Sequence, residues 1–381
     1  MKKNRFSTYI VDFDRLVLFS YLSLCLIGLI AMVDITSVQS QMGYFYKQLL
    51  FTAISATVAI LILYAFKLDK VRFTNNTWLV YVAIGMLIFV LIKGSAVKGA
   101  TRAIRIGPLS FQPSFFARIA LVFYYASILD KKNELLRQTK SILRFPENFP
   151  ALSLLTIVVF GLILIEKHLS TIIIGGMTLL GMLFYAGIRK RILFIILIIG
   201  MIGGALIITQ GDSFRMKRMR SFKKYSLFFP ERDLSHSDDS DYQVRESLTA
   251  LTSGGLLGTG ISRGRGKHYY LPEARTDYVY TIIGEETGFI GAMVVFLLHC
   301  TLFFASMRIA ERQENMYLKL LAAGMAMNIF CNVLVNTGVA MSILPPTGNT
   351  LPFISYGGSA LLMDSIAVGV ILNISAKRRE L

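Results

Sequence analysis

"LVLFSYLSLCLIGLIAMV", residues Leu16–Val33, is an apolar run without a single charged residue. A helix needs about 20 mostly apolar residues to cross the hydrocarbon core of a bilayer, so this run predicts a membrane-spanning helix. Lys2, Lys3 and Arg5 precede it, as in a secretory signal peptide, but the run is long and no small-residue cleavage site follows. We therefore expect an uncleaved first span.

The rest of the chain is similarly apolar. Of its 381 residues, 54% are hydrophobic and 17% are charged, whereas soluble domains carry about 25% charged residues. This composition predicts an all-α, polytopic membrane protein with one membrane domain over residues 1–381. Ten runs of near-spanning length occur, at Leu16–Val33, Leu49–Phe66, Trp78–Ile92, Ser114–Leu129, Ala151–Ile165, Leu169–Ile188, Ile192–Thr209, Gly288–Ile309, Leu320–Ile343 and Ser359–Ser375.

Lysine and arginine are concentrated at the N-terminus, at every second connection and in the C-terminal tail. Because short cytoplasmic loops carry an excess of these residues, the pattern predicts that both termini are cytoplasmic. That orientation requires an even number of spans and agrees with ten. The connection from Gln210 to Thr276 (residues 210–276), between spans 7 and 8, is then a large extracytoplasmic loop. Loops of this length are usually functional or disordered, and we expect this one to be functional.

The formal net charge of +17 suits a partner that carries negative charge, such as anionic lipid or phosphate. No DNA- or RNA-binding motif is present, so nucleic acid is not expected. Cations in or near the predicted outer connections include Arg102, Arg118, Arg215, Lys224 and Arg275. Contact with lipid headgroups is one interpretation. For the group as a whole we favour a site for a phosphorylated, membrane-embedded substrate, because arginine holds phosphate through paired hydrogen bonds.

The three cysteines, Cys25, Cys300 and Cys331, provide neither a disulfide framework nor the spacing of a metal site. No cofactor is evident. Binding of a divalent cation at the acidic run Asp238–Asp241 is a weaker alternative to a solvated loop.

"YLPEARTDYVYTIIGEETGFIG", residues Tyr270–Gly291, places four acidic residues at the start of an apolar run. If Asp277 opens a helix, a rotation of about 100° per residue puts it on the same stripe as Gly284 and Gly288. A stripe of small residues predicts a close helix–helix contact, which would bring Asp277 against a neighbouring helix at the outer membrane surface. Alternatively, Asp277 is the N-cap of that helix.

Three further carboxylates lie near or within the predicted hydrocarbon region. Glu285 and Glu286 come too deep to cap the same helix, and such groups are costly unless they are paired. We therefore expect at least one of them to have a basic partner. Asp364, inside the last span, is either a functional residue or is hydrogen-bonded to Asn332 or Asn336.

The Tyr270–Gly291 stretch resembles the signature P-E-x-x-T-D-(F/Y)-(I/V)…G-E-E-x-G-(F)-(I/L)-G of the SEDS family (shape, elongation, division and sporulation), which includes FtsW, RodA and SpoVE. "NTGVAMSILPPTGNTLPFISYGGSALL" (Asn336–Leu362) resembles the second family signature, N-x-G…L-P-x-T-G-x-x-L-P-(F/L)-I-S-Y-G-G-S-x-L-L. "FQPSFFAR" (Phe111–Arg118) resembles Q-P-S-E-x-x-K. The resemblance covers nearly the whole chain.

The resemblance implies a peptidoglycan glycosyltransferase in the bacterial cytoplasmic (inner) membrane, with its active site facing outward. It would polymerise Lipid II during cell division or elongation, with Asp277 as the general base. The "KHYYLPEA" run (Lys267–Ala274) favours an FtsW-like over a RodA-like member. Expected partners are a class B penicillin-binding protein transpeptidase and other divisome or elongasome proteins. The expected substrate-binding residues are Arg102, Arg118, Arg215, Lys224, Arg275, Gln112, Glu286 and Ser355.

The chain departs from the family pattern at three places. Phe115 stands where the signature has glutamate and Arg118 where it has lysine, so the salt bridge expected between these two positions cannot form. Arg102 is followed by Ala103 in place of tryptophan, and His168 replaces an acid. These changes indicate a variant branch. Two other functions stay open: a flippase for the same lipid-linked precursor, which needs no general base, and a non-catalytic scaffold.

Overall fold

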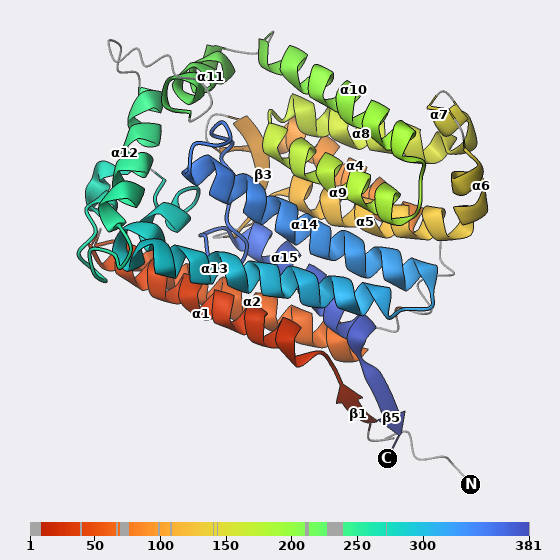
Figure 1. Ribbon diagram of the computed structural model, residues 1–381, viewed down its shortest axis with the longest axis horizontal. Coiled ribbons are helices and arrows are strands. Elements are labelled where there is room, and N and C mark those ends of the chain that lie inside the picture. Colours follow the sequence, from red (N-terminus) through yellow and green to blue (C-terminus); the bar gives the residue numbers. More distant parts are fainter. Residues whose placement is uncertain are drawn as a thin grey trace.

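The computed structural model describes residues 9–38, 40–65, 68, 76–97, 100–106, 109–139, 141–142, 144–209, 213–226, 239–271 and 273–380. It is a bundle of long helices (Figure 1). The two ends of the chain lie together at one end of the bundle, and helices α11 and α12 lie at the other.

Each of the ten predicted apolar runs coincides with one helix, apart from shifts of several residues at the ends. The helices are α1 (Arg15–Val38), α2 (Met42–Ala65), α4 (Thr77–Lys93), α5 (Pro113–Lys131), α8 (Pro150–Ile165), α9 (Leu169–Tyr185), α10 (Lys190–Thr209), α13 (Val279–Glu311), α14 (Met316–Ala340) and α15 (Gly358–Ser375). Among the described residues, α1, α2, α13, α14 and α15 are long and apolar enough to cross a membrane. Helices α4, α8 and α9 are apolar but shorter.

The predicted outer loop between α10 and α13 contains helices of its own. These are α11 (Ser213–Tyr225), α12 (Asp239–Gly254) and a short π-helical turn, η1 (Gly266–Tyr270). Two short helices, α6 (Asn133–Gln138) and α7 (Arg144–Asn148), connect α5 to α8 at the opposite end of the bundle.

Helix α14 lies at the centre of the bundle, in contact with α5, α9, α13 and α15. Its small residues Ala322, Ala323 and Gly324 are buried, and a Cβ atom added at Gly324 would lie 2.7 Å from the sulfur of Met182. Small residues let helices approach closely in a membrane, where packing rather than water exclusion holds helices together. In contrast, α2 exposes most of its apolar length, as a helix that contacts lipid does.

Two small sheets were not predicted. Strands β2 (Ser95–Val97), β3 (Ala100–Ile106) and β4 (Leu109–Phe111) form an antiparallel sheet just before α5. Strand β1 (Tyr9–Asp12) pairs antiparallel with β5 (Lys377–Glu380). The described chain is therefore mostly helical, and its first and last described elements are hydrogen-bonded to each other.

Helix α13 is interrupted at Gly288, whose φ of 69° and ψ of −169° are not helical. The segment Gly254–Gly260, after α12, binds to this break through its backbone. The N–H groups of Thr259 and Gly260 donate to carbonyl groups before the break, each at 3.0 Å, and the N–H of Phe289 donates back to a carbonyl of the segment at 2.9 Å. The break thus fixes the glycine-rich segment on the outer end of α13.

The close helix–helix contact predicted for the glycine stripe is confirmed at Gly284. A Cβ atom at Gly284 would lie 2.6 Å from Leu251 of α12, and one at Gly288 would overlap the backbone of the Gly254–Gly260 segment. The neighbouring helix is α12, which belongs to the outer loop. Asp277 precedes α13 and does not open it, so the expected common helix face is wrong.

Candidate active site

A cavity of about 230 Å³, here called the Asp277 cavity, lies where several chain segments meet at the end of the bundle that carries β3 and the outer loop. These are α2, the strands β3 and β4, the starts of α5 and α15, the turn between α8 and α9, the segment before α13 and the loop between α14 and α15. Its lining residues are Phe51, Arg102, Ser110, Gln112, Phe115, His168, Thr276, Asp277, Gly348, Thr350, Tyr356, Gly357, Gly358, Ser359 and Ala360. Three predicted site residues, Asp277, Arg102 and Gln112, thus line one cavity.

Asp277 is held by its backbone and is 8% exposed. Its N–H donates to the carbonyl of Glu273 at 3.1 Å, and its own carbonyl accepts a hydrogen bond from Asn336 Nδ2 at 3.1 Å. Helix α13 begins at Val279 with Tyr278 as its N-cap, so the alternative in which Asp277 caps the helix is wrong. The carboxylate lines the cavity from a fixed main chain.

Arg102 reaches across from β3 to the turn between α8 and α9. Its Nε donates to the carbonyl of Glu166 at 3.0 Å and its Nη2 to the carbonyl of Lys167 at 2.6 Å. The Glu166 side chain is buried, and this burial raises the pKa of its carboxyl group to about 8, although the charge of Arg102 acts in the opposite direction. Arg102 therefore fixes the turn as well as lining the cavity.

His168 stands in this turn, at the position where the SEDS pattern has an acid. It is 4% exposed and lines the Asp277 cavity. Its Nδ1 lies 2.9 Å from Ser114 Oγ and 3.1 Å from Thr171 Oγ1, and its ring meets that of Phe115 edge-on. The departure from the family pattern thus places an imidazole in the candidate site. The sequence showed that an acid is missing here, but not that the histidine lines the cavity.

Gln112 marks the junction of α5 with α15. Its backbone N–H donates to Ser359 Oγ at 3.1 Å, and that hydroxyl donates to the carbonyl of Ser110 at 2.8 Å. All three residues line the cavity. Sequence reasoning chose Ser355 instead of Ser359, although both belong to the same I-S-Y-G-G-S segment.

Ser355 does not appear among the cavity-lining residues. It is 3% exposed, and its Oγ accepts a hydrogen bond from the N–H of Leu351 at 2.9 Å. Its carbonyl accepts one from Gln48 Nε2 at 3.3 Å. It therefore shapes the loop that presents its neighbour, Tyr356, to the cavity. Burial raises the pKa of the Tyr356 hydroxyl.

Arg275 holds the segment that carries Asp277. Its Nη1 donates to Gln41 Oε1, and its guanidinium lies 4.0 Å from the centre of the Tyr44 ring. Its carbonyl accepts a hydrogen bond from the N–H of Tyr356 at 2.8 Å. These contacts tie the segment to the connection between α1 and α2, to α2 itself and to the α14–α15 loop.

Arg118 lies deeper than the cavity and is 3% exposed. Its Cζ is 5.3 Å from the centre of the Phe115 ring, and it is Phe115, rather than Arg118, that lines the cavity. Lys224 lies in α11, where its Nζ is 5.7 Å from the centre of the Tyr225 ring. Arg215 also lies in α11, but its side chain is outside the described part of the chain.

Glu286 has the basic partner that its depth required. Lys267 of η1 is fully buried, and its Nζ donates to Glu286 Oε1 and to both carboxylate oxygens of Asp34, each of the latter at 2.7 Å. Ser262 Oγ adds a hydrogen bond to Asp34 at 2.5 Å. We call Lys267, Asp34 and Glu286 the buried triad. It joins the outer loop to α1 and α13. Glu286 therefore has a structural role, and it does not line the Asp277 cavity.

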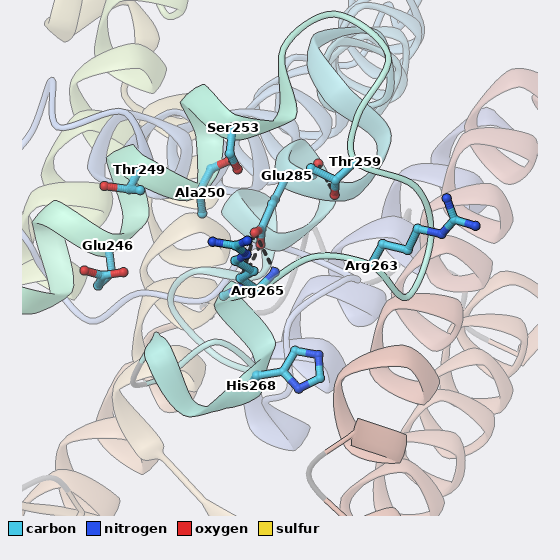
Figure 2. A pocket seen from close by; sticks show the side chains of 10 residues that line it. Glu246, Thr249, Ala250, Ser253, Thr259, Arg263, Arg265, His268 and Glu285 are labelled. Atoms are coloured by element: carbon cyan, nitrogen blue, oxygen red, sulfur yellow. Dashed lines mark hydrogen bonds between the residues drawn. The ribbon is translucent and has the colours of Figure 1, made fainter.

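A second cavity, of about 770 Å³, lies between α12, the glycine-rich segment and α13 (Figure 2). Figure 2 shows Glu285 next to Arg265, with His268 farther from Glu285, and all three residues line the cavity. The Glu285 carboxylate accepts hydrogen bonds from the backbone N–H groups of Arg265 at 2.7 Å and Gly266 at 3.0 Å. Main-chain donors thus satisfy the Glu285 carboxylate.

A family model described as "Cell cycle protein", for FtsW, RodA and SpoVE, matches residues 14–380. The chain belongs to the FtsW/RodA/SpoVE family. It is 32% identical to the "Probable peptidoglycan glycosyltransferase FtsW" of Trichlorobacter lovleyi, over 96% of this chain and 94% of that one. It is 33% identical to the Coxiella burnetii protein of the same name, over 97% and 98% of the two chains. Bacillus subtilis "Stage V sporulation protein E" is also 33% identical, over 96% and 98%.

Two solved structures show that the fold is that of the FtsW/RodA/SpoVE family. One, named "Structural coordination of polymerization and crosslinking by a peptidoglycan synthase complex", superimposes with a TM-score of 0.76 at 22% identity, covering 95% of this chain and 97% of that chain. The other is RodA, the rod shape determining protein of Thermus thermophilus, with a TM-score of 0.68 at 23% identity, over 95% and 96%.

Proposed function

We propose that this member of the FtsW/RodA/SpoVE family is a peptidoglycan glycosyltransferase that polymerises Lipid II into glycan strands. The observation that carries the proposal is the Asp277 cavity, which joins a backbone-fixed carboxylate to Arg102 and Gln112. The relatives named as glycosyltransferases match over nearly the full chain, which supports the same activity here. Two of these relatives are named FtsW, which favours a role in cell division over elongation.

In the proposed reaction, the 4-hydroxyl oxygen of one sugar attacks the anomeric carbon of another. A new C–O bond forms, the bond from the anomeric carbon to undecaprenyl pyrophosphate breaks, and the electron pair leaves with the pyrophosphate. Asp277 takes the hydroxyl proton as general base, and the anomeric configuration inverts. Arg102 stabilises the negative charge that develops on the leaving group, while Gln112 orients the sugar.

The size of the Asp277 cavity fits this assignment. Its volume of about 230 Å³ is below the range of about 300–1,000 Å³ typical of sites that enclose a whole drug-sized ligand. We infer that it encloses only the reacting part of one precursor, and that the lipid tail lies along the outside of the bundle. Arg215 and Lys224 of α11 remain predictions for contacts to lipid phosphate outside the cavity.

We place this chain in the bacterial cytoplasmic membrane with ten spans, both termini in the cytoplasm and the Asp277 cavity on the outer side. The pairing of β1 with β5 supports an even number of crossings, because it brings both ends to the same end of the bundle. We also propose a class B penicillin-binding protein as partner. The similar solved structure is named as a complex for polymerization and crosslinking, which supports such a pairing.

The test is a polymerisation assay. The full-length protein is purified with its cognate class B penicillin-binding protein, supplied with Lipid II, and analysed for glycan polymer by gel electrophoresis. We expect Asp277→Ala to lose about 100-fold or more of the rate, in line with the 10²–10⁴ that a general base contributes.

The control is Glu314→Gln, which neutralises an exposed carboxylate in the connection between α13 and α14. It should leave the rate within about twofold, as surface substitutions usually do. If Asp277→Ala makes polymer at the wild-type rate, the catalytic assignment is wrong. If the folded wild-type complex makes none, translocation of labelled Lipid II across liposomes then tests the flippase alternative.

A further inference from the structure

Arg118 and Asp364 are two buried charged side chains that the proposed reaction does not use. Arg118 is 3% exposed and Asp364 is 1% exposed. Within the part of the chain that the structure describes, neither Arg118 Nε and Nη1 nor the two carboxylate oxygens of Asp364 make a hydrogen bond. Ionised groups inside a membrane bundle are costly without a partner of opposite charge, so each of them needs a counterion.

The two side chains lie at the same depth. The Gln112 N–H···Ser359 Oγ hydrogen bond joins the start of α5 to the start of α15. Arg118 follows Gln112 by six residues and Asp364 follows Ser359 by five, which at 1.5 Å per residue is about 9 Å and about 7.5 Å further along. The two helices are in contact. The charges of Arg118 and Asp364 are close enough to act on each other across this contact, without a direct hydrogen bond between the atoms named above.

Arg118 and Asp364 lie directly beneath the Asp277 cavity. Phe115 and Ala360 line the cavity, and Arg118 and Asp364 follow them by three and four residues, respectively. Residues at these spacings occupy the same face of a helix one turn apart. The charged groups therefore support the floor of the cavity from below.

We propose that Asp364 is the counterion of Arg118, and that this ion pair between α5 and α15 positions the residues that form the floor of the Asp277 cavity. In the Q-P-S-E-x-x-K pattern the acid lies three residues before the cation on the same helix, and Phe115 occupies that place here. This chain supplies the acid from α15 instead, so the lost charge is replaced across a helix interface. Asp364 is a positioning residue, and its effect on the reaction rests on the activity proposed above.

The test removes the carboxylate from α15 and introduces one on α5, at the position where the family pattern has glutamate. Four forms of the full-length protein are compared: wild type, Asp364→Leu, Asp364→Leu with Phe115→Glu, and Asp364→Leu with Phe115→Gln. The Phe115 ring already lies 5.3 Å from Arg118 Cζ, so a glutamate there can reach the guanidinium. The glutamine variant has the same shape without the charge and is the matched control.

Each form is reconstituted with the cognate class B penicillin-binding protein, and kcat and KM for Lipid II polymerisation are measured. We expect Asp364→Leu to lower kcat at least about tenfold, because it leaves a buried cation without an acid. Glutamate at position 115 should restore kcat to within about threefold of wild type, since the pair then forms within one helix, and glutamine should not. Equal rescue by both, or an unchanged Asp364→Leu, would overturn the proposal.

Thermal unfolding of the same four proteins in detergent tests the ion pair without relying on activity. Asp364→Leu should unfold several degrees below wild type, and only the glutamate form should recover. If the wild-type complex makes no polymer, the order of the four Tm values still decides whether Asp364 pairs with Arg118. Four identical Tm values would show that it does not.

Discussion

At the residue scale, Glu166 provides a pH test of the turn that carries His168. Burial raises the pKa of its carboxyl group from 4.5 to about 8. The stability that an acid with a raised pKa contributes is fully present below the unfolded pKa and is lost as the pH rises through the folded pKa. We expect the Tm of the wild type to fall between about pH 4.5 and pH 8, and that of Glu166→Gln to fall less. Scanning fluorimetry across this range measures both, and parallel curves would contradict the assignment.

The buried triad is a second residue-scale target. Lys267→Met leaves Asp34 and Glu286 as two buried carboxylates with no shared cation, and breaking such a pair costs about 3–5 kcal/mol. We expect a Tm well below wild type. Neutralising the whole triad (Lys267→Met, Asp34→Asn, Glu286→Gln) should recover most of the loss, whereas the exposed Lys190→Met control should change little. A Tm for Lys267→Met equal to that of the control would show that the triad is not stabilising.

The sequence predicted the kind of partner that a buried charged side chain needs, but not which residue supplies it. The depth of Glu286 required a basic partner, but Lys267 could not be named, because a loop residue reaches α13 only through the folded η1 turn. One of the two alternatives for Asp364 was a hydrogen bond from its carboxylate to Asn332 or Asn336, but neither carboxylate oxygen makes a hydrogen bond with the described residues. Asn336 Nδ2 instead donates to the carbonyls of Asp277 and Asn349, while Asn332 Oδ1 accepts from Asn349 Nδ2.

At the element scale, the break in α13 makes a specific prediction about glycine. Gly288 has a φ of 69°, and a Cβ atom there would overlap backbone atoms of Leu256 and Gly258. Gly288→Ala should therefore destabilise the protein by about 1–3 kcal/mol or more through backbone strain. The control is Gly85→Ala in α4, where a Cβ atom meets nothing within 4 Å and alanine favours the helix. Chemical denaturation in detergent compares the two, and equal midpoints would contradict a strained position.

Helices were predictable because a span of apolar residues leaves the backbone no hydrogen-bond partner except itself. The short strands β2 and β4 have three residues each, too few to show an alternating pattern. The interruption of α13 at Gly288 could not be predicted from the sequence for a different reason. Glycine is compatible with both a continuous helix and a break, and only the docked Gly254–Gly260 segment decides between them.

At the scale of the whole molecule, the orientation in the membrane can be tested by cysteine labelling. In a protein whose Cys25, Cys300 and Cys331 are replaced by alanine, Glu273→Cys and Lys190→Cys each add one exposed thiol. We expect a membrane-impermeant maleimide to label position 273 in cells with an intact cytoplasmic membrane. Position 190 should be labelled only after that membrane is opened. Labelling of both sites in intact cells, or of neither, would contradict the proposed topology.

The buried triad also constrains the order in which the protein assembles. Asp34 and Lys267 are 233 residues apart, so α1 leaves the ribosome long before its cation is synthesised. Until then the Asp34 carboxylate must stay hydrated at the outer end of α1, because ionised groups in hydrocarbon are costly. When η1 docks, that carboxylate becomes buried and the early and late parts of the chain are joined. Because Glu286 belongs to α13, which follows η1 in the chain, the triad is complete only after α13 has been synthesised. A chain that ends before α13 therefore leaves α1 without the contact that joins it to the outer loop.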